Sequence, residues 1–538
     1  MSKVNLDALI RREDLEVREE KYQSVTAVHS VTIAALKKGD FFFESLRKPD
    51  FQRETCEWTP EKVFNLVQSF TSGDLIPAII LWKGDGNTFV IDGAHRLSAL
   101  IAWVCNDYGD KILSNTFFGQ SISTAQIKFA DEARKLIENE IGSYQEITWA
   151  AENPNVADTK KLAIARRLSS QPIHLQWVPG DAVNAEKSFF KINEAASPLD
   201  TTEKRLLNAR NKPNAIASRA IMRAGSGHKY WAKFSSENQK IIEDISKEIS
   251  DWLFTPQLDG PVKTLDIPLA GKNYSAQTME LILNIVNFSN GIKLVDSSKI
   301  KKSKDFPEND IKEESSDGQE TIQYLQNTKK MLANITGTQS SSLGLHPAIY
   351  FYSLQGRYQI TAFLAVLYLV KDYENRKQIT YFTQVRRLFE EFLWEHKGIV
   401  NQATTKWGSA AKGYVNLSKL FDFIITNLRE NKTKEEILKL LDEHEEYNFY
   451  KPSIKELDPK YRKTFSTESK NEVFMKQGVA NALKCGICQG YLHKNSIQID
   501  HRQAIEDGGI GNAENGQVTH PYCNSIKKKL IEIGFVTE

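Results

Sequence analysis

Cysteine is scarce in this chain, because only five of its 538 residues are cysteines and two of them, Cys56 and Cys105, stand alone. Such usage excludes a disulfide framework and favours a reducing cytoplasm with a metal site. Long apolar runs are also missing: the longest, residues 360–370, is too short to cross a bilayer and predicts a buried helix. The charged N-terminus lacks the apolar segment of a signal peptide. We therefore expect a soluble, cytoplasmic protein without a membrane partner.

An excess of charge of one sign is absent too, since 70 Lys and Arg residues face 68 Asp and Glu residues. The net charge of +2 gives no global sign of a nucleic-acid-binding protein, so any affinity for DNA has to come from local patches. The length exceeds what one hydrophobic core usually holds, which predicts several domains.

The residue pattern predicts an α+β protein of three domains. Residues 1–210 mix short strands and helices, residues 211–473 have mainly helical periodicity, and residues 474–538 form a separate, metal-binding end. In the middle region, residues 297–319 are charged and almost free of large apolar side chains. This composition predicts a mobile insertion between helices.

The densest chemical signal lies near the C-terminus. Cys485 and Cys488 form a C-x2-C pair, and His520 and Cys523 form an H-x2-C pair. Thiolates and imidazole are the ligands of tetrahedral structural zinc sites, so we predict that these four residues hold one Zn2+ ion.

Between and beside these pairs lie residues suited to phosphodiester hydrolysis. Asp500 and Asn524 offer hard oxygen ligands for a catalytic cation such as Mg2+ or Mn2+. His501 follows Asp500 and points the opposite way if the segment is a strand. One face could then hold the metal while the neighbouring imidazole deprotonates a water molecule.

These residues closely resemble the HNH (ββα-metal) nuclease family, in which a C-x2-C pair, an Asp-His step, a Gly-Gly turn, an internal Asn and a short helix follow one another. The resemblance implies a ββα-metal module with a zinc knuckle. It implies that Asp500 and Asn524 bind the catalytic metal and that His501 is the general base. It also implies that Asn515 ties down the loop and orients His501. Many relatives have His where this chain has Asn524, which favours a hard cation at the catalytic position.

A second signal lies around residue 92. Residues 77–82 and 88–91 predict two buried strands joined by a turn, and a helix follows the sequence Asp92-Gly-Ala-His-Arg96. His95 and Arg96 then lie in the first helical turn, where cations oppose the helix dipole unless an anion binds. The free N–H groups and the guanidinium predict a phosphate site. The alternative is an internal ion pair of Arg96 with an acidic residue such as Asp92.

Residues 35–210 resemble the ParB/sulfiredoxin-like domain of GmrSD-type modification-dependent restriction enzymes and of the SspE-type phosphorothioate-sensing nuclease. The matching pieces, in chain order, are Phe51-Gln52-Arg53, Trp58, Ile76-Pro77, Asp92 to Leu97, and Phe189 to Asn193. The resemblance implies that six residues bind nucleotide or phosphate: Asp92, Gly93, His95, Arg96, Arg53 and Asn193.

Two departures from that family pattern concern the same segment. Ala94 and His95 stand where these enzymes commonly have two glutamines, so hydrolysis of a nucleotide stays open. Sulfiredoxins have a nucleophilic cysteine at the position of Ala94, so sulfinic-acid reductase chemistry is not expected.

The two motif sets together predict a Mg2+-dependent HNH DNA endonuclease that acts in bacterial anti-phage defence and is gated by modified DNA, by a nucleotide, or by both. A lone HNH site cuts one strand, so we expect nicking unless the protein forms a homodimer. The expected cofactors are structural Zn2+, catalytic Mg2+ or Mn2+, and a nucleoside triphosphate. Two alternatives stay open: a non-catalytic, zinc-containing regulator that binds nucleic acid, and an RNA-cleaving abortive-infection toxin.

Overall fold

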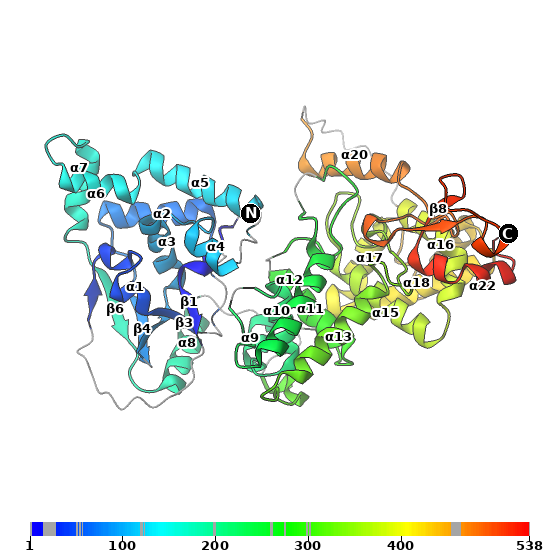
Figure 1. The fold of residues 1–538 in the computed structure, drawn as a ribbon, viewed down its shortest axis with the longest axis horizontal. Helices are drawn as coiled ribbons and strands as arrows, with labels where there is room; N and C mark the ends of the chain where they lie inside the picture. Colours follow the sequence, from blue (N-terminus) through cyan, green and yellow to red (C-terminus); the bar gives the residue numbers. More distant parts are fainter. Residues whose placement is uncertain are drawn as a thin grey trace. The chain divides into compact units, whose positions relative to one another are not determined.

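The computed structural model places most of the chain in two compact units (Figure 1). It describes residues 3–13, 28–49, 52, 55, 58–84, 86–118, 122, 124–196, 201–226, 228–258, 262–273, 276–296, 300, 303–452 and 464–536. The first unit comprises Met1–Leu207 with Ser226–Tyr230, and the second comprises Asn208–Gly225 with Trp231–Glu538. The three predicted domains, with boundaries at residues 210 and 473, stay a prediction.

The first unit is built on a six-stranded mixed sheet with the strand order β1-β3-β5-β4-β6-β2. The strands are β1 (Arg11–Glu13), β2 (Ser30–Val31), β3 (Leu46–Pro49), β4 (Ile79–Gly84), β5 (Asn87–Asp92) and β6 (Ile173–Trp177). Strands β4 and β5 pair antiparallel with Gly84 opposite Asn87, which confirms the predicted hairpin. Strands β3 and β6 lie parallel to β5 and β4, respectively.

Both faces of the β4–β5 hairpin are buried, because successive strand residues point to opposite sides. Leu81 and Val90 belong to a core shared with α2 (Pro60–Ser72) and α3 (Ala94–Cys105). Trp82 and Phe89 pack on the other side against residues of α8 (Ala182–Ala196) (Figure 1). The end of β5, where the predicted phosphate motif begins, is thus held by two layers of helices.

The second unit is helical over most of its length, as its periodicity predicted. Its longer helices are α10 (Pro213–Met222), α11 (Ser236–Phe254), α12 (Ala276–Ser289), α13 (Gln319–Ala333), α15 (Ile360–Asn375), α16 (Ile379–Glu395), α17 (Gly398–Trp407), α18 (Tyr414–Arg429), α19 (Lys434–Glu443) and α20 (Thr467–Ala480). The apolar run 360–370 lies in α15 and is buried at most of its positions, as predicted. Among the described residues, no helix combines the length and apolarity that crossing a membrane requires.

Within the predicted mobile insertion, two side chains of residues 303–310 are buried. Residues 303–310 form two short 3-10 turns, and Phe306 between them is buried. The carboxylate of Glu308 is fully buried and accepts a hydrogen bond from Asn287 Nδ2 of α12 at 2.9 Å. Phe306 and Glu308 are thus buried although the segment around them is polar. Residues 297–299 and 301–302 lie outside the described residues.

A buried charge cluster holds the N-terminal segment against the sheet of the first unit. Asp7 Oδ1 accepts hydrogen bonds from Arg12 Nη2 at 2.8 Å, from Lys48 Nζ at 2.7 Å and from the backbone N–H of Thr55 at 3.0 Å. All three charged side chains are almost fully buried. Asp7 therefore pairs with two buried cations, Arg12 of β1 and Lys48 of β3.

We expect Asp7→Asn to destabilise the first unit by about 3–5 kcal/mol, the usual cost of removing the charge of one partner in a buried ion pair. Thermal unfolding of the full chain, followed by circular dichroism, measures the loss of stability as a lower midpoint temperature of the transition. Glu13→Gln is the matched control, since Glu13 pairs with Arg47 at the surface and its side chain is 48% exposed. Equal unfolding curves for the two variants would contradict the role of Asp7.

Candidate zinc centre and nuclease motif

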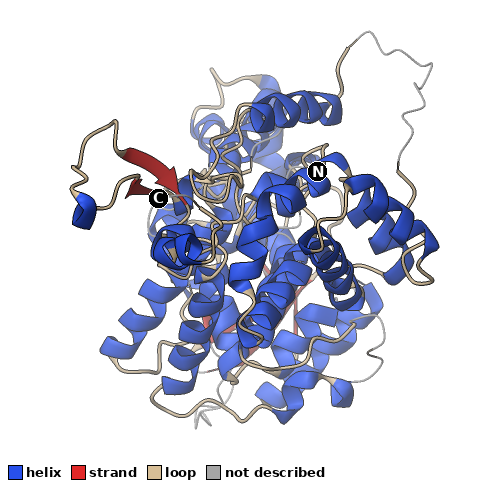
Figure 2. Ribbon diagram, turned by 90° about the vertical axis from the view of Figure 1, so that its right-hand side faces the viewer, coloured by secondary structure: helices blue, strands red, loops and turns tan. Residues whose placement is uncertain are grey.

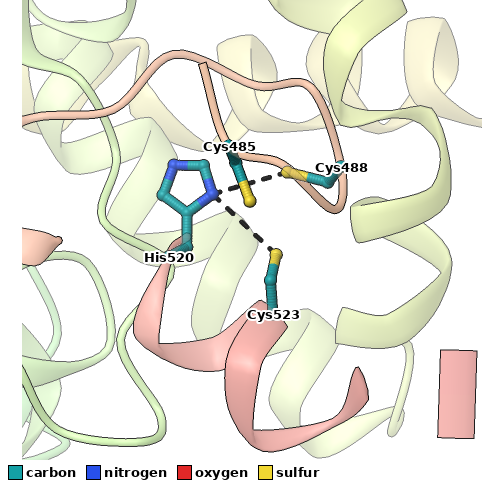
Figure 3. Close-up of side chains that lie close together, drawn as sticks. All are labelled: Cys485, Cys488, His520 and Cys523. Carbon is teal, nitrogen blue, oxygen red and sulfur yellow. Dashed lines mark hydrogen bonds between the residues drawn. The ribbon is translucent and has the colours of Figure 1, made fainter. Parts of the chain in front are cut away.

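The four predicted zinc ligands come together in the structure (Figure 3). The ligand atoms of Cys485, Cys488, His520 and Cys523 all lie within 4.8 Å of one another, and all four residues are buried. Cys488 Sγ lies 3.4 Å and Cys523 Sγ lies 3.8 Å from His520 Nδ1. Three sulfurs and one imidazole nitrogen facing a common centre are the donor set of a closed zinc site.

Two tight backbone turns present these ligands. The first cysteine pair sits in a turn closed by hydrogen bonds from Cys485 N to Gly490 O and from Gln489 N to Cys485 O, with Gln489 in the left-handed conformation at a φ of 59°. The second pair opens the short helix α21 (Pro521–Ser525), which His520 precedes as its N-cap. Helical geometry brings residues three apart to the same side, so His520 and Cys523 face the first turn together.

The imidazole of His520 is oriented for metal binding by a backbone carbonyl. His520 Nε2 lies 3.0 Å from Tyr491 O, and a carbonyl can only accept, so Nε2 carries the proton and Nδ1 offers its lone pair to the sulfurs. Burial lowers the pKa of His520, which keeps the imidazole neutral. Both effects favour a metal ligand over a charged side chain.

Burial also raises the pKa of Cys488 to about 12, and hydrogen bonding to Cys485 raises the pKa of Cys523. Without a cation Cys488 and Cys523 therefore hold their protons, whereas hydrogen bonds from these two thiols lower the pKa of Cys485. A divalent soft cation displaces such protons and removes the repulsion between thiolates, so the donor set fits Zn2+.

A buried ion pair ties this cluster to the helical part of the same unit. Glu390 of α16 accepts from Arg386 Nε at 2.7 Å and from the backbone N–H of Tyr491 at 2.7 Å. Tyr350 Oη donates to the same carboxylate at 2.9 Å. Both charged side chains are at most 1% exposed. Tyr491 thus contacts both sides of this arrangement. Its backbone N–H donates to Glu390, and its carbonyl orients the imidazole of His520.

The segment between the two ligand pairs forms a hairpin, and two short helices come after it, the first of which carries Cys523. Strands β7 (Gln498–His501) and β8 (Gly516–Thr519) pair antiparallel, with Asp500 opposite Gln517. Helices α21 and α22 (Lys527–Glu532) follow. In Figure 2 the hairpin is the pair of red strands beside the C-terminal label. This order of elements is the ββα arrangement that the motif predicted.

The two sides of β7 differ in their surroundings. Gln498 and Asp500 face the helices: Asn524 Nδ2 donates to Gln498 Oε1 at 2.9 Å, and Lys527 Nζ lies 3.1 Å from Asp500 Oδ2. Gln517 Nε2 also donates to Asp500 Oδ2, at 2.9 Å. By strand alternation His501 points to the opposite side. The hard-oxygen residues and the histidine therefore occupy opposite sides of one strand.

Asn515 holds the loop that connects the strands. Its Oδ1 accepts from Gln503 N at 2.8 Å, and its Nδ2 donates to Gln503 O at 3.1 Å and to Ile510 O at 3.0 Å. Gly511 in this loop lies beside the imidazole of His501, since a Cβ atom there would come within 3.7 Å of Nε2. Asn515 thus fixes the loop next to His501, and its described hydrogen bonds run to the loop and not to the imidazole.

At the other motif, Asp92 ends β5 and Gly93 caps α3 with a φ of 92°. A Cβ atom on Gly93 would lie 2.7 Å from Ile79 Cδ1, so both the backbone conformation and the space favour glycine. His95 stacks on Trp58 with 5.7 Å between the centroids. Arg53 lies outside the described residues, and Asn193 belongs to α8 but its side chain is not described.

Arg96 is bound by partners within its own chain. Its Nη2 lies 2.5 Å from Asp92 Oδ2, and its Nη1 donates to Pro77 O at 2.6 Å. This is the internal ion pair that stood as the alternative to an anion site. Asp92 supplies the negative charge that the helix start and the guanidinium attract.

Several residues of these sites gave no signal in the sequence. Glu390 and Arg386 are an ordinary i, i+4 pair on a helix, and Gln498 and Gln517 belong to no motif. Lys527 is one of three consecutive lysines, and only the packing of α22 on β7 selects it as the partner of Asp500.

The structure thus defines a chain with a mixed α/β N-terminal unit and a C-terminal ββα hairpin beside a Cys3His cluster. Residues 35–210 match the family described as "GmrSD restriction endonuclease, N-terminal domain". The predicted resemblance is therefore confirmed over the range expected, and the match supports a GmrSD-type restriction endonuclease. No curated protein and no solved structure matches the chain.

Metal analysis should find about one zinc ion per chain, as expected for one closed four-ligand site. Cys485→Ser removes one thiolate and should lose the ion and unfold the C-terminal hairpin, which hydrogen exchange of residues 484–524 measures. Cys105→Ser is the control, because Cys105 lies outside the cluster. Zinc retained in the Cys485 variant would refute the ligand assignment.

Glu390→Gln leaves the buried guanidinium of Arg386 without its counter-ion, so we expect a loss of stability of about 3–5 kcal/mol. It also weakens the hold on Tyr491, so zinc should leave the protein faster. The rate of zinc transfer to a chromogenic chelator checks the second effect. Glu391→Gln on the same helix is the control, since Glu391 pairs with Arg387 at the surface. An unchanged transfer rate would show that Glu390 does not reach the zinc centre.

Proposed function

We propose that this protein is a metal-dependent HNH endonuclease that cuts DNA in anti-phage defence and is gated through its GmrSD-type N-terminal unit. The observation that carries the proposal is the β7–β8–α21 arrangement, in which Asp500 and Asn524 lie on the helix side of one strand and His501 on the other. The GmrSD match supports DNA as the substrate.

The oxygen ligands suit Mg2+ or Mn2+. Asp500 offers a carboxylate and Asn524 an amide oxygen, and hard cations prefer such oxygens. When bound, the cation would act as a Lewis acid toward the phosphodiester. The charge of Asp500 is balanced by Lys527 at 3.1 Å, so the same carboxylate is stabilised when no cation is present.

His501 acts as the general base in this proposal. The imidazole is partly exposed and lies beside Gly511 of the connecting loop. One nitrogen takes the proton of the attacking water while the loop held by Asn515 keeps the imidazole in place. The hydroxide then adds to phosphorus, and the leaving sugar oxygen departs from the same phosphate.

The N-terminal unit supplies the gate. A phosphate of modified DNA or of a nucleoside triphosphate would replace Asp92 as the partner of Arg96 at the start of α3, with His95, Gly93, Arg53 and Asn193 as further contacts. The Asp92–Arg96 pair then distinguishes a resting from a liganded state. Hydrolysis of the nucleotide is not part of the proposal.

We expect His501→Ala to lower the rate of plasmid cleavage by about 100-fold or more, because general-base catalysis contributes at least that much. The assay uses matched unmodified and modified plasmids with Mg2+ or Mn2+, with and without each nucleoside triphosphate, and scores nicked and linear products. His174→Ala, a substitution of an exposed histidine on β6, is the control. Zinc content should be equal in all three proteins.

Equal cleavage by wild type and His501→Ala would contradict the proposed base. A wild-type protein that cuts no plasmid but degrades RNA would point to the toxin alternative. A protein that protects against phage equally well with and without His501 would favour the zinc-containing regulator.

A further inference from the structure

A chain of hydrogen bonds beside the proposed metal site joins Thr338, Gln498 and Asn524. Gln498 Nε2 donates to the backbone carbonyl of Thr338 at 2.9 Å. Gln498 Oε1 accepts from Asn524 Nδ2, also at 2.9 Å. Thr338 lies in the segment after α13, so the chain of hydrogen bonds begins in the helical part of the unit and ends on α21.

This chain fixes which way each amide points. A backbone carbonyl can only accept a hydrogen bond, so Gln498 must present its nitrogen to Thr338 and its oxygen to Asn524. Asn524 must then present its nitrogen to Gln498, which turns Oδ1 away. Among the described residues, no hydrogen bond occupies that oxygen. A cation binds the oxygen of a side-chain amide and not its nitrogen, so the orientation decides whether Asn524 can be a ligand.

We propose that Gln498 is a positioning residue that sets the amide orientation of Asn524 for the catalytic cation, with Thr338 as its anchor. The inference rests on the proposed function, because it needs Asn524 to bind a metal. Asp500 requires no such device, since both oxygens of a carboxylate can bind a cation. Its neighbours Gln517 and Lys527 stabilise its charge instead.

The segment that contains Thr338 also holds the helix that carries Asn524. Tyr522 N donates to Ser342 O at 2.9 Å, and Ser525 Oγ donates to Ser340 O at 3.0 Å. Residues 338–342 therefore contact α21 on either side of Asn524 in sequence and contact β7 through Gln498. The hydrogen bonds from Tyr522 N and Ser525 Oγ hold α21 in place. Gln498 therefore controls only the orientation of the Asn524 amide.

The test measures Mn2+ binding to the zinc-loaded full chain by electron paramagnetic resonance. Gln498→Leu removes both side-chain hydrogen bonds, and we expect it to weaken Mn2+ binding by about tenfold, the lower range for residues that orient a metal ligand. Gln503→Leu is the matched control, because its side chain contacts only Asp507 O in the connecting loop. Gln498→Met repeats the test with an unbranched side chain if the leucine variant loses zinc.

Asn524→Asp provides the decisive background. A carboxylate has no amide orientation to set, so Gln498→Leu should change Mn2+ binding by less than about threefold when residue 524 is Asp. A purely structural role of Gln498 would weaken binding equally in both backgrounds, and that result would overturn the proposal. Wild-type-like binding by both Gln498 variants would overturn it as well.

Asp500→Ala separates this inference from the function on which it rests. Loss of Mn2+ binding in Asp500→Ala, combined with the background-dependent effect of Gln498→Leu, supports both. Loss in Asp500→Ala without an effect of Gln498 leaves the proposed metal site standing and refutes the positioning role. Unchanged binding in Asp500→Ala refutes the metal site and the positioning role together.

Discussion

The buried carboxylate of Glu390 is the interaction on which the C-terminal half of the protein depends. It receives the guanidinium of Arg386, the hydroxyl of Tyr350 and the backbone N–H of Tyr491. Through the Tyr491 peptide it reaches His520, whose Nε2 is held by the Tyr491 carbonyl. A charge buried to this degree tolerates no missing partner, so helix α16 and the metal cluster form one cooperative structure.

The zinc cluster and the proposed catalytic residues share the same short helix. Cys523, a predicted zinc ligand, and Asn524, an expected ligand of the catalytic cation, are neighbours on α21. Adjacent helical residues point in different directions, so one faces the sulfur cluster while the other reaches Gln498 of β7. In the proposed function, a zinc ion held by the Cys3His cluster would therefore also fix the backbone that carries Asn524.

The N-terminal unit also contains carboxylates that pair with cations, and two of these ion pairs differ in their exposure to solvent. Asp7 pairs with Arg12 and Lys48 in a cluster whose three side chains are at most 2% exposed. Asp92 neutralises Arg96 at the start of a helix, where their side chains are 33% and 16% exposed. The first carboxylate is therefore enclosed, whereas solvent reaches the Asp92–Arg96 pair, and the proposed gate depends on this difference.

Local sequence determined the features that depend on short spacing: the four zinc ligands, the β4–β5 hairpin, the Asp-His step on a strand and the resemblance over residues 35–210. Spacing fixes these because a turn or a strand sets side-chain direction by itself. Only the tertiary structure revealed the partners of Glu390 and Gln498, and it placed Arg96 in an ion pair with Asp92, which the sequence had left as an alternative. Glu390 and Tyr491 are 101 residues apart, and Gln498 and Thr338 are 160 apart. Carboxylates and amides are common on every helix and strand, so nothing but the packing of distant segments decides which of them is buried and what it binds.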